Sequence, residues 1–432
     1  MHVSLKTLGC RLNEAELETW AQAFQNAGHH ITRDIEQAQL VIINSCAVTQ
    51  DAARKSRHLI RRIHRDNPHA KLVVSGCYAT LNEQEASALL GVDLVISNRD
   101  KNQLVETTLA QLNMAVMPQL STDPGEISLF TRGRQRAFVK VQDGCRYRCT
   151  FCIVTVARGE EISRPIPLIV DEINALHQQG IDEVILTGVH LGGYGSEINT
   201  QLTELIQVIL KETSIQRLRL GSLEPWELSD EFYTLFENPR LLPHLHLPLQ
   251  SGSDAVLRRM ARRCKTAEFA SMVTRLRAIS PQFNITTDII VGFPGETQQE
   301  WQESYDFVQQ MGFGHVHIFS YSPRAGTKAA SLPNPVPEAI KKQRSRQLHD
   351  LASVMKQQFC QSQLGQTLPV LWEAYTEAYQ DQRLTFGYTP NYLRVACVTA
   401  PDECLANHIS YACLSKVTEN YILTERLSLS QQ

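Results

Sequence analysis

The sequence predicts an α/β protein in three parts: a parallel α/β layer domain over residues 1–116, a partial (β/α)6 barrel over residues 131–362, and a small β-barrel over residues 365–430. Strand and helix signals alternate along the first hundred residues, which is typical of a parallel sheet. Six strand-like runs with helical spacers follow, and short β-rich runs fill the end of the chain. With 432 residues, the chain is too long for one ordinary core.

The first part alternates apolar strand-like runs with amphipathic helical segments. We expect strands near residues 3–8, 40–43, 71–74 and 92–96, and helices near residues 13–27, near residues 52–65 and from Glu83 onward.

Three of these strands are followed directly by a cysteine: Cys10, Cys46 and Cys77. Because the ligand crevice of an open α/β sheet forms at the carboxyl ends of its strands, we expect the three cysteines to converge on one point. The alternative is that they are small buried residues, which are common at strand ends.

A polar stretch with proline and glycine at residues 117–136 predicts a linker. After it, an apolar strand-like run leads into CRYRCTFC, where Cys145, Cys149 and Cys152 are spaced C-x3-C-x2-C. A four-iron cluster normally takes four thiolates, so three leave one iron open to a substrate or cofactor. The alternative is zinc, but tetrahedral zinc needs four ligands, and the sequence has no second C-x2-C or close His pair nearby.

The second part contains six strand-like runs: FVKV, EVILTGV, RLRLGSL, HLHLPLQ, ITTDIIVGF and HVHIFSY. Six β/α units form an incomplete version of the eightfold barrel, whose active sites lie in the loops at the carboxyl ends of the strands. Those loops carry the cysteine motif and the polar segments TGVHLGGYG, SLEP, PLQSGSD and GFPGET. After PNPVPE, residues 341–359 have the periodicity of an amphipathic closing helix.

The last part contains five β-rich runs that predict a small barrel: LPVLWEAY, RLTFGYT, YLRVACV, SYACLSKV and YILTERL. From Gln366 on there are four Lys and Arg against seven Asp and Glu, so charge alone does not make this part an RNA binder.

Composition predicts a globular cytoplasmic protein, with 43% hydrophobic and 20% charged residues, a net charge of -3 and no run of 18 apolar residues. In a reducing compartment the 11 cysteines are expected to be metal ligands, reactive thiols or core residues rather than disulfides. Five fall in no motif and are expected to be small, partly buried residues: Cys264, Cys360, Cys397, Cys404 and Cys413.

Several motifs together carry a resemblance to a known family: TLGCRLN, NSCAVT, SGCYA, CRYRCTFC followed by ARG, LTGVHLGGYG, GSLEPWE, HLPLQSGSD, TTDIIVGFPGET and FSYSPRAGT. By these motifs the chain resembles the methylthiotransferases of the radical S-adenosylmethionine (radical SAM) superfamily over essentially its whole length. The C-terminal part is similar to a TRAM domain. SLEP and GYTPNYLRV, at residues 387–395, are most similar to the bacterial branch that acts on threonylcarbamoyladenosine beside the tRNA anticodon.

The resemblance implies a reaction and its cofactors. Two 4Fe-4S clusters would be held by two sets of three cysteines: Cys145, Cys149 and Cys152, and Cys10, Cys46 and Cys77. The first cluster would cleave S-adenosylmethionine to a 5'-deoxyadenosyl radical that abstracts hydrogen from C2 of the adenine, and the second would present the sulfur. One S-adenosylmethionine is then the methyl donor and a second is the radical source.

The expected partners are tRNA, through its anticodon stem-loop, and an electron donor such as flavodoxin or ferredoxin. The sulfur donor stays open. We expect a monomer that does not associate with membranes.

Further cofactor contacts are expected at Phe151, for the adenine, at Gly188, for the methionine amino group, and at Gln250, for cofactor or ribose. Ordinary packing is the alternative for Phe151, and a satisfied buried amide is the alternative for Gln250. Arg158 and Arg164 are candidates to hold a carboxylate or phosphate, with solvated surface arginines as the alternative.

The sequence departs from the family at three places. Thr155 and Val156 follow the last core cysteine where the family often has a proline and an aromatic residue. Ile162 replaces the first arginine of Arg-Ser-Arg, and Cys264 stands where a tyrosine is usual. None of these positions is a presumed iron ligand.

Basic runs and tyrosines are the candidate RNA contacts. The first run is Arg54, Lys55, Arg57, Arg61, Arg62 and Arg65, and the second is Arg258, Arg259, Arg262, Arg263 and Lys265. Such runs bind phosphates or form solvated helix faces. Tyr375, Tyr388 and Tyr392 would stack on unpaired bases or serve as core aromatics.

The leading hypothesis is an enzyme that methylthiolates C2 of threonylcarbamoyladenosine in tRNA. The alternatives are methylthiolation of isopentenyladenosine in tRNA, methylthiolation of a ribosomal protein side chain, and a non-catalytic iron-sulfur or zinc RNA-binding protein.

Overall fold

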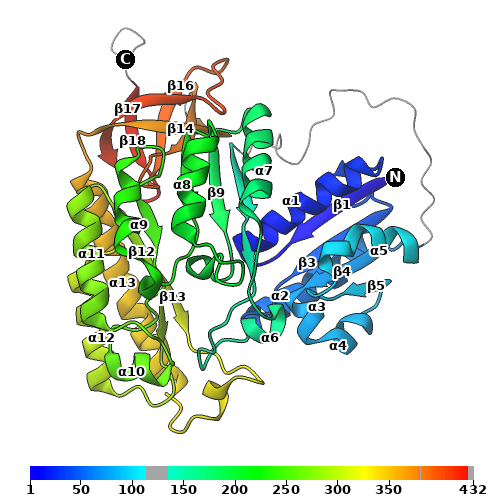
Figure 1. Cartoon of the computed structure of the whole chain (residues 1–432), viewed down its shortest axis with the longest axis horizontal. Coiled ribbons are helices and arrows are strands. Elements are labelled where there is room, and N and C mark those ends of the chain that lie inside the picture. The colour runs from blue at the N-terminus through cyan, green and yellow to red at the C-terminus, as the bar shows by residue number, and fades with distance from the viewer. Residues whose placement is uncertain (113–134, 380, 427–432) are drawn as a thin grey trace. The chain divides into compact units, whose positions relative to one another are not determined.

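The computed structural model describes residues 1–112, 135–379 and 381–426, and the chain forms two compact units (Figure 1). Unit 1 comprises Met1–Arg132, Asp143–Glu161 and Arg324–Thr327, and unit 2 comprises Gly133–Gln142, Ile162–Pro323 and Lys328–Gln432. The predicted linker at residues 117–136 lies outside the described residues as far as residue 134. The CRYRCTFC loop belongs to unit 1, although it follows that stretch in the sequence.

Unit 1 is built on a parallel five-stranded sheet with the strand order β2-β1-β3-β4-β5. Its strands are β1 (His2–Thr7), β2 (His30–Thr32), β3 (Leu40–Ser45), β4 (Lys71–Gly76) and β5 (Leu94–Ile96). Every residue of β3 is buried, as expected for a central strand covered on both faces. The predicted alternation of strands and helices is confirmed. Strand β2 was not predicted, because three residues are too few to show a periodicity.

Helices cover both faces of this sheet, which Figure 1 shows in blue and cyan. They are α1 (Arg11–Asn26), α2 (Gln50–Asp66), α3 (Cys77–Leu81), α4 (Glu83–Ser87) and α5 (Leu104–Gln111), with a 3-10 turn at Lys101–Gln103 and α6 (Val154–Arg158) from the cysteine loop. Successive side chains of a strand face opposite ways, so Leu40 and Ile42 pack with α1 and α5 while Val41 and Ile43 pack with α2.

The helices that follow the adjacent strands β1 and β3 therefore lie on opposite faces of the sheet. In a sheet of this strand order, that arrangement leaves a crevice outside the carboxyl ends of the two strands, which is the usual ligand position.

Unit 2 contains the six parallel strands that the sequence predicts. They are β6 (Arg136–Lys140), β9 (Glu183–Thr187), β10 (Arg217–Leu220), β11 (His244–His246), β12 (Asn284–Val291) and β13 (His315–Ser320). The strands pair in chain order, with parallel bridges from Leu218 to Leu241 and from Ser222 to His246 joining the two three-stranded sheets. No pairing joins β13 to β6 within the described residues, so the partial barrel is open, as expected.

Helices follow the strands of the partial barrel. They are α7 (Ile166–Gln178), α8 (Leu202–Glu212), α9 (Asp230–Thr234), α10 (Asp254–Arg259), α11 (Thr266–Ile279), α12 (Gln298–Met311) and α13 (Glu338–Ser362). Helix α13 contains the predicted amphipathic closing helix. None of the helices described is both long and apolar enough to span a bilayer.

The end of the chain forms a closed five-stranded barrel, with the order β14-β15-β16-β18-β17. The strands are β14 (Thr367–Tyr379), β15 (Gln382–Tyr388), β16 (Arg394–Thr399), β17 (Ile409–Val417) and β18 (Ile422–Arg426). Each matches one of the five predicted β-rich runs. The barrel is filled by Trp372, Val395, Leu414 and their neighbours, and the Trp372 indole donates to the Ser410 hydroxyl at 2.8 Å.

Buried charges of β9 and β10 fasten this small barrel to the partial barrel. The fully buried Glu183 carboxylate accepts from Arg217 Nε at 2.7 Å and from Arg219 Nε at 3.1 Å. The two guanidiniums also donate to the backbone oxygens of Tyr388, at 3.1 Å, and Pro390, at 3.0 Å. Burial acts to raise the pKa of Glu183, but the arginines outweigh it and hold that pKa at about 2.

Candidate functional site

Three loops at the carboxyl edge of the unit 1 sheet bring Cys10, Cys46 and Cys77 together. Cys10 lies just before α1, Cys46 directly follows β3, and Cys77 begins α3 immediately after β4. The Cys10 and Cys46 thiols interact electrostatically with each other and with that of Cys77. A Cβ atom added at Gly9 would lie 2.9 Å from Cys46 Sγ, so the loop after β1 passes directly over this cysteine.

Polar neighbours orient the cysteines. The Cys10 thiol lies 3.5 Å from Asn13 Oδ1, and Asn98 Nδ2 donates to Cys77 Sγ at 3.6 Å. The bond from Asn98 is of the kind that stabilises a metal-binding thiolate, because the Cys77 sulfur accepts it, whereas the Cys10 thiol donates to Asn13.

Desolvation raises the pKa of Cys10 and raises that of Cys46 to about 11; Arg158 opposes the rise at both thiols without cancelling it. Metal binding needs deprotonated thiols. Because the nearby guanidinium favours deprotonated thiols, it suits a site where thiolates hold a metal cluster. Three thiols, with no fourth cysteine beside them in the part of the chain that the structure describes, fit an iron-sulfur cluster with one open iron better than closed tetrahedral zinc.

Arg158, at the end of α6, lies in a buried ion network beside these thiols. Its guanidinium donates to Glu16 at 2.9 Å, to Asp143 at 3.0 Å and to Asn13 at 2.7 Å. Lys101 donates to the same two carboxylates, at 2.6 Å to Glu16. The side chains of Arg158 and Glu16 are each 3% exposed. Arg158 is therefore not a solvated surface arginine, and the carboxylates that it binds are those of the protein itself.

The loop with the other three cysteines also belongs to unit 1, and Cys145, Cys149 and Cys152 are all half-buried. The Cys145 amide donates to Gly159 O at 3.2 Å, which closes the loop onto the end of α6, and the Cys152 amide donates to Cys149 O at 3.0 Å. Gly144, with φ +70°, enters the loop where a Cβ atom would lie 1.8 Å from a backbone oxygen. Only glycine fits there.

The expected cofactor contacts fall in both units. Phe151 is half-buried in the unit 1 loop. Gly188 follows β9 of unit 2, where a Cβ atom would lie 2.9 Å from Gln142 Oε1. Gln250 is buried and has φ +79°, and its amide donates to Asp288 O at 2.8 Å. A non-glycine residue held in the left-handed region stores strain, which is common at ligand sites.

Arg164, the other candidate for a carboxylate or phosphate, forms an ion pair with Glu172 at 2.7 Å and donates to Lys140 O at 2.6 Å. As with Arg158, the carboxylate in contact is one of the protein's own.

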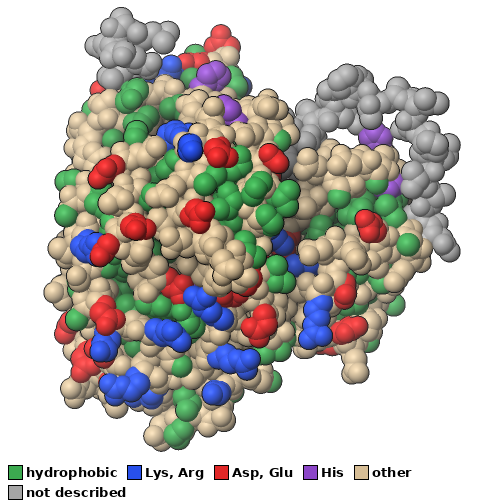
Figure 2. All heavy atoms as spheres, viewed as in Figure 1, with side chains coloured by type: hydrophobic (Ala, Val, Ile, Leu, Met, Phe, Trp, Pro, Cys, Tyr) green, Lys and Arg blue, Asp and Glu red, His purple; other side chains and the backbone are tan. Residues whose placement is uncertain are grey.

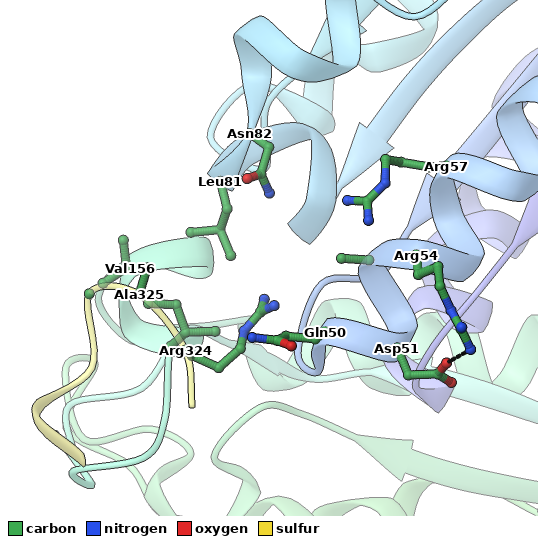
Figure 3. A pocket seen from close by; sticks show the side chains of 12 residues that line it. Gln50, Asp51, Arg54, Arg57, Leu81, Asn82, Val156, Arg324 and Ala325 are labelled. Atoms are coloured by element: carbon green, nitrogen blue, oxygen red, sulfur yellow. Dashed lines mark hydrogen bonds and ion pairs between the residues drawn. The ribbon is translucent and has the colours of Figure 1, made fainter. Parts of the chain in front are cut away.

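A cavity of about 700 Å³ opens within unit 1 between the start of α2, the end of α3, and the residues that flank the cysteine loop (Figure 3). Its lining includes Arg57, Asn82 and Arg324, whose side chains point toward the same space, with Leu81 and Val156 as apolar walls. Arg57 belongs to the first basic run, and Arg324 belongs to the FSYSPRAGT motif. Nothing in the sequence pairs these two positions.

The side chains of the two basic runs differ in their exposure and in their contacts. On α2, Arg54 and Lys55 pair with Asp51, at 2.6 and 2.7 Å, and remain exposed. On the second run, Arg259 binds Glu300 through both nitrogens, at 2.9 and 2.7 Å. Arg262 of the same run lies over the Trp226 ring at 4.3 Å, so Arg259 and Arg262 both serve internal contacts. On the face seen in Figure 2, basic and acidic side chains are interspersed, in keeping with the net charge of -3.

Two of the three candidate stacking tyrosines are packing residues. Tyr388 and Tyr392 stack at 5.0 Å, with Arg136 at 4.3 Å over the first ring and Arg219 at 4.3 Å over the second. The segment GYTPNYLRV thus lies at the junction of the two barrels. Tyr375 is 54% exposed, whereas Tyr388 and Tyr392 are half-buried.

The five unassigned cysteines divide by burial. Cys264, Cys360 and Cys397 are buried, Cys413 is half-buried, and Cys404 is exposed. The expectation of partial burial is therefore wrong for Cys404, which lies in the exposed connection between β16 and β17.

Two protein families match the sequence: Uncharacterized protein family UPF0004, over residues 2–97, and the Radical SAM superfamily, over residues 139–308. The chain is 39% identical, over 86% of its length and 87% of the relative's, to the threonylcarbamoyladenosine tRNA methylthiotransferase MtaB of Thermotoga maritima. It is 34% identical to the protein of the same name in Bacillus subtilis, over 91% of this chain and 89% of that one. It is 32% identical to the tRNA-2-methylthio-N(6)-dimethylallyladenosine synthase of a Wolbachia pipientis strain, over 97% and 98% of the two chains.

Among solved structures, the chain is similar to the radical S-adenosylmethionine methyltransferase TsrM of Kitasatospora setae, with cobalamin and a 4Fe-4S cluster bound. The TM-score is 0.59 at 15% identity, over 76% of this chain and 77% of that one. It is also similar to the cobalamin-dependent S-adenosylmethionine radical enzyme OxsB, with a TM-score of 0.51 at 12% identity, over 83% and 56% of the two chains. At these identities the likeness is one of fold.

Proposed function

This chain belongs to the radical SAM methylthiotransferase family, and from that membership we propose that it transfers a methylthio group to C2 of threonylcarbamoyladenosine next to the anticodon of tRNA. It is an enzyme of the radical SAM tRNA methylthiotransferase kind, which implies a 4Fe-4S cluster and S-adenosylmethionine. The proposal adds the nucleoside, a second cluster and the use of two S-adenosylmethionine molecules.

The observation that carries the proposal is the gathering of Cys10, Cys46 and Cys77 at the switch point of the unit 1 sheet. These residues would hold the second cluster. The family's radical cluster would be held by the loop cysteines: Cys145, Cys149 and Cys152. A 4Fe-4S cluster with S-adenosylmethionine supplies a carbon radical strong enough to remove hydrogen from an aromatic ring.

The protein's own contribution is positioning and charge. Three thiols in each set leave one cluster position free of protein ligand. Arg158 neutralises the carboxylates of Glu16 and Asp143 and opposes the rise that burial causes in the pKa of Cys10 and Cys46. Phe151, Gly188 and Gln250 are the proposed contacts for S-adenosylmethionine, and the strained backbone of Gln250 supports this assignment for that residue.

The remaining parts of the proposal are the domain limits, the partners and the compartment. We assign residues 1–116 to the domain with the second cluster, residues 131–362 to the radical core and residues 365–430 to the TRAM-like barrel. The partners are the tRNA anticodon stem-loop and a flavodoxin or ferredoxin as electron donor. The enzyme would act as a monomer in the cytoplasm, where tRNA is modified.

The substrate is tested by mass spectrometry of tRNA nucleosides from a strain that lacks the gene. We expect 2-methylthio-threonylcarbamoyladenosine to disappear and threonylcarbamoyladenosine to accumulate. Unchanged levels of that product would overturn the proposal. Loss of the isopentenyl product instead would favour the second candidate, which the similarity to the dimethylallyladenosine synthase supports.

The cluster assignment is tested with Cys149→Ala, prepared without oxygen. The wild type should hold about eight irons per chain and the variant about four, with no 5'-deoxyadenosine formed from S-adenosylmethionine and dithionite. Cys404→Ala, at an exposed cysteine outside both sets, is the matched control and should retain both properties. If Cys149→Ala still cleaves S-adenosylmethionine, the loop does not hold the radical cluster.

A further inference from the structure

The unit 1 cavity has the chemistry of an anion site. Three arginines and one aspartate line it, and Figure 3 shows the Arg54 side chain turned to that aspartate, Asp51, with which it pairs at 2.6 Å. The Arg57 and Arg324 side chains point toward the open space instead. Arg57 pairs with Glu85 at 3.4 Å, through a partner that is 48% exposed, and such a pair is weak. Its guanidinium also lies 5.9 Å from the centre of the Tyr78 ring.

Arg324 has no ion pair among the described residues and is half-buried, so its charge is available to a ligand. Its guanidinium is partly withdrawn from water, with no carboxylate of the described residues to compensate it.

The rest of the lining is mixed. Leu81, Val156 and Ala325 supply apolar walls, and the amides of Gln50 and Asn82 supply donors and acceptors. A cavity of about 700 Å³ is in the usual range for a small organic group. A recessed pocket with apolar walls suits a compact group that carries a carboxylate, a hydroxyl and a methyl better than it suits the phosphates of an RNA backbone, which the exposed face of α2 can meet.

We propose that Arg57 and Arg324 together bind the carboxylate of the threonyl group on the substrate adenosine. Arg324 lies in FSYSPRAGT, a motif of the whole family, so selection of this nucleoside over one with an uncharged substituent depends on the pair, to which Arg57 contributes a residue outside the family motifs. The inference rests on the proposed function, because it concerns the substrate of the same site. An isopentenyl group offers no acceptor, so it would leave a desolvated guanidinium unmatched. A site that binds a polar group of its substrate discriminates strongly against an analogue that lacks this group. An apolar pocket discriminates much less against an analogue that lacks a methylene group.

The test uses the reconstituted full-length enzyme and two anticodon stem-loops, one with threonylcarbamoyladenosine and one in which the threonyl carboxylate is a carboxamide. For the wild type we expect kcat/KM and affinity to favour the acid by about ten- to hundredfold, the worth of one charge-assisted hydrogen-bonded contact. Arg324→Met should reduce that preference to about threefold or less, and Arg324→Lys should restore part of it. The iron content of each variant must match the wild type.

The matched control is Arg61→Met, on the exposed face of the same helix and outside the cavity lining. Loss of a general phosphate contact weakens both stem-loops equally, so the acid preference should stay. Equal rates of the wild type on acid and amide would overturn the carboxylate inference and leave the proposed substrate intact. Turnover of an isopentenyladenosine stem-loop but not of the acid would overturn the proposed substrate itself, and this inference with it.

Discussion

Removing the Arg158 guanidinium should destabilise unit 1 through the two carboxylates that it neutralises. In Arg158→Met, Glu16 and Asp143 would lose the guanidinium that binds both of them and keep the ammonium of Lys101, in a site where the Glu16 and Arg158 side chains are only 3% exposed. Breaking a buried ion pair by removing one partner costs about 3–5 kcal/mol. Most of that loss of stability comes from the negative charge of the carboxylate that is left without its partner. Removing this charge as well should therefore restore part of the lost stability.

The double variant Arg158→Met/Glu16→Gln tests that reasoning. It leaves Lys101 and Asp143 as one balanced pair, so its cost should fall below the sum of the two single changes by about 2 kcal/mol, a coupling in the range measured for contacting residues. The assay is hydrogen exchange of the α1 amides in iron-free protein, which reports the local opening free energy without a contribution from bound metal.

The charge-balance argument is tested by the additivity of the two changes and by a control variant. Additive effects, with the double variant equal to the sum within about 0.5 kcal/mol, would refute the charge-balance argument. The control Arg61→Met changes an exposed residue on α2 and should alter the exchange of α1 by less than about 0.5 kcal/mol.

Two further predictions concern acid stability and a glycine. The pKa of Glu183 is about 2, below its ordinary value of 4.5, so the carboxylate stabilises the fold above pH 4.5 and this contribution is lost as the pH falls toward 2. In urea unfolding, the wild type should therefore be more stable than Glu183→Gln by about 3 kcal/mol near neutral pH, and this difference should shrink below pH 4.5. A difference that does not change with pH would contradict the lowered pKa of Glu183. Gly76→Ala places a Cβ atom 2.3 Å from Ser45 O, whereas Gly28→Ala, also at positive φ, meets no atom within 4 Å. Thermal unfolding should thus show that Gly76→Ala loses about 1–3 kcal/mol more unfolding free energy than Gly28→Ala. The iron content should fall only in Gly76→Ala, because Gly76 precedes Cys77. Equal losses of stability in the two variants would exclude the clash as the cause.

The sequence was sufficient for the order of strands and helices, because alternating and helical periodicities are local signals. Each of the three strands followed by a cysteine was predicted, and their place in a parallel sheet put Cys10, Cys46 and Cys77 at the same edge. The position of Cys10 as the residue before α1, rather than at the strand end itself, was not evident.

The surroundings of the thiols were not predictable, because they depend on side chains that are far apart in the sequence. Arg158 follows the CRYRCTFC motif and has no visible partner there, yet it binds Glu16 and Asp143 in the folded unit. Likewise, Arg57 and Arg324 line one cavity although one lies in a helix near the N-terminus and the other in a loop after the last barrel strand. No periodicity or spacing encodes such pairs.

The division of the chain into six alternating segments has a practical meaning for how this enzyme can be dissected. A fragment that ends before residue 143 would lack Ala157, which packs in the core of unit 1, and both Asp143 and Arg158 of its ion network. Such a fragment would expose apolar surface and leave Lys101 without Asp143 and Glu16 without Arg158, so we do not expect it to fold or assemble iron as the whole chain does. The cysteines of the first hundred residues can be studied only in a protein that also carries the loop that comes after them.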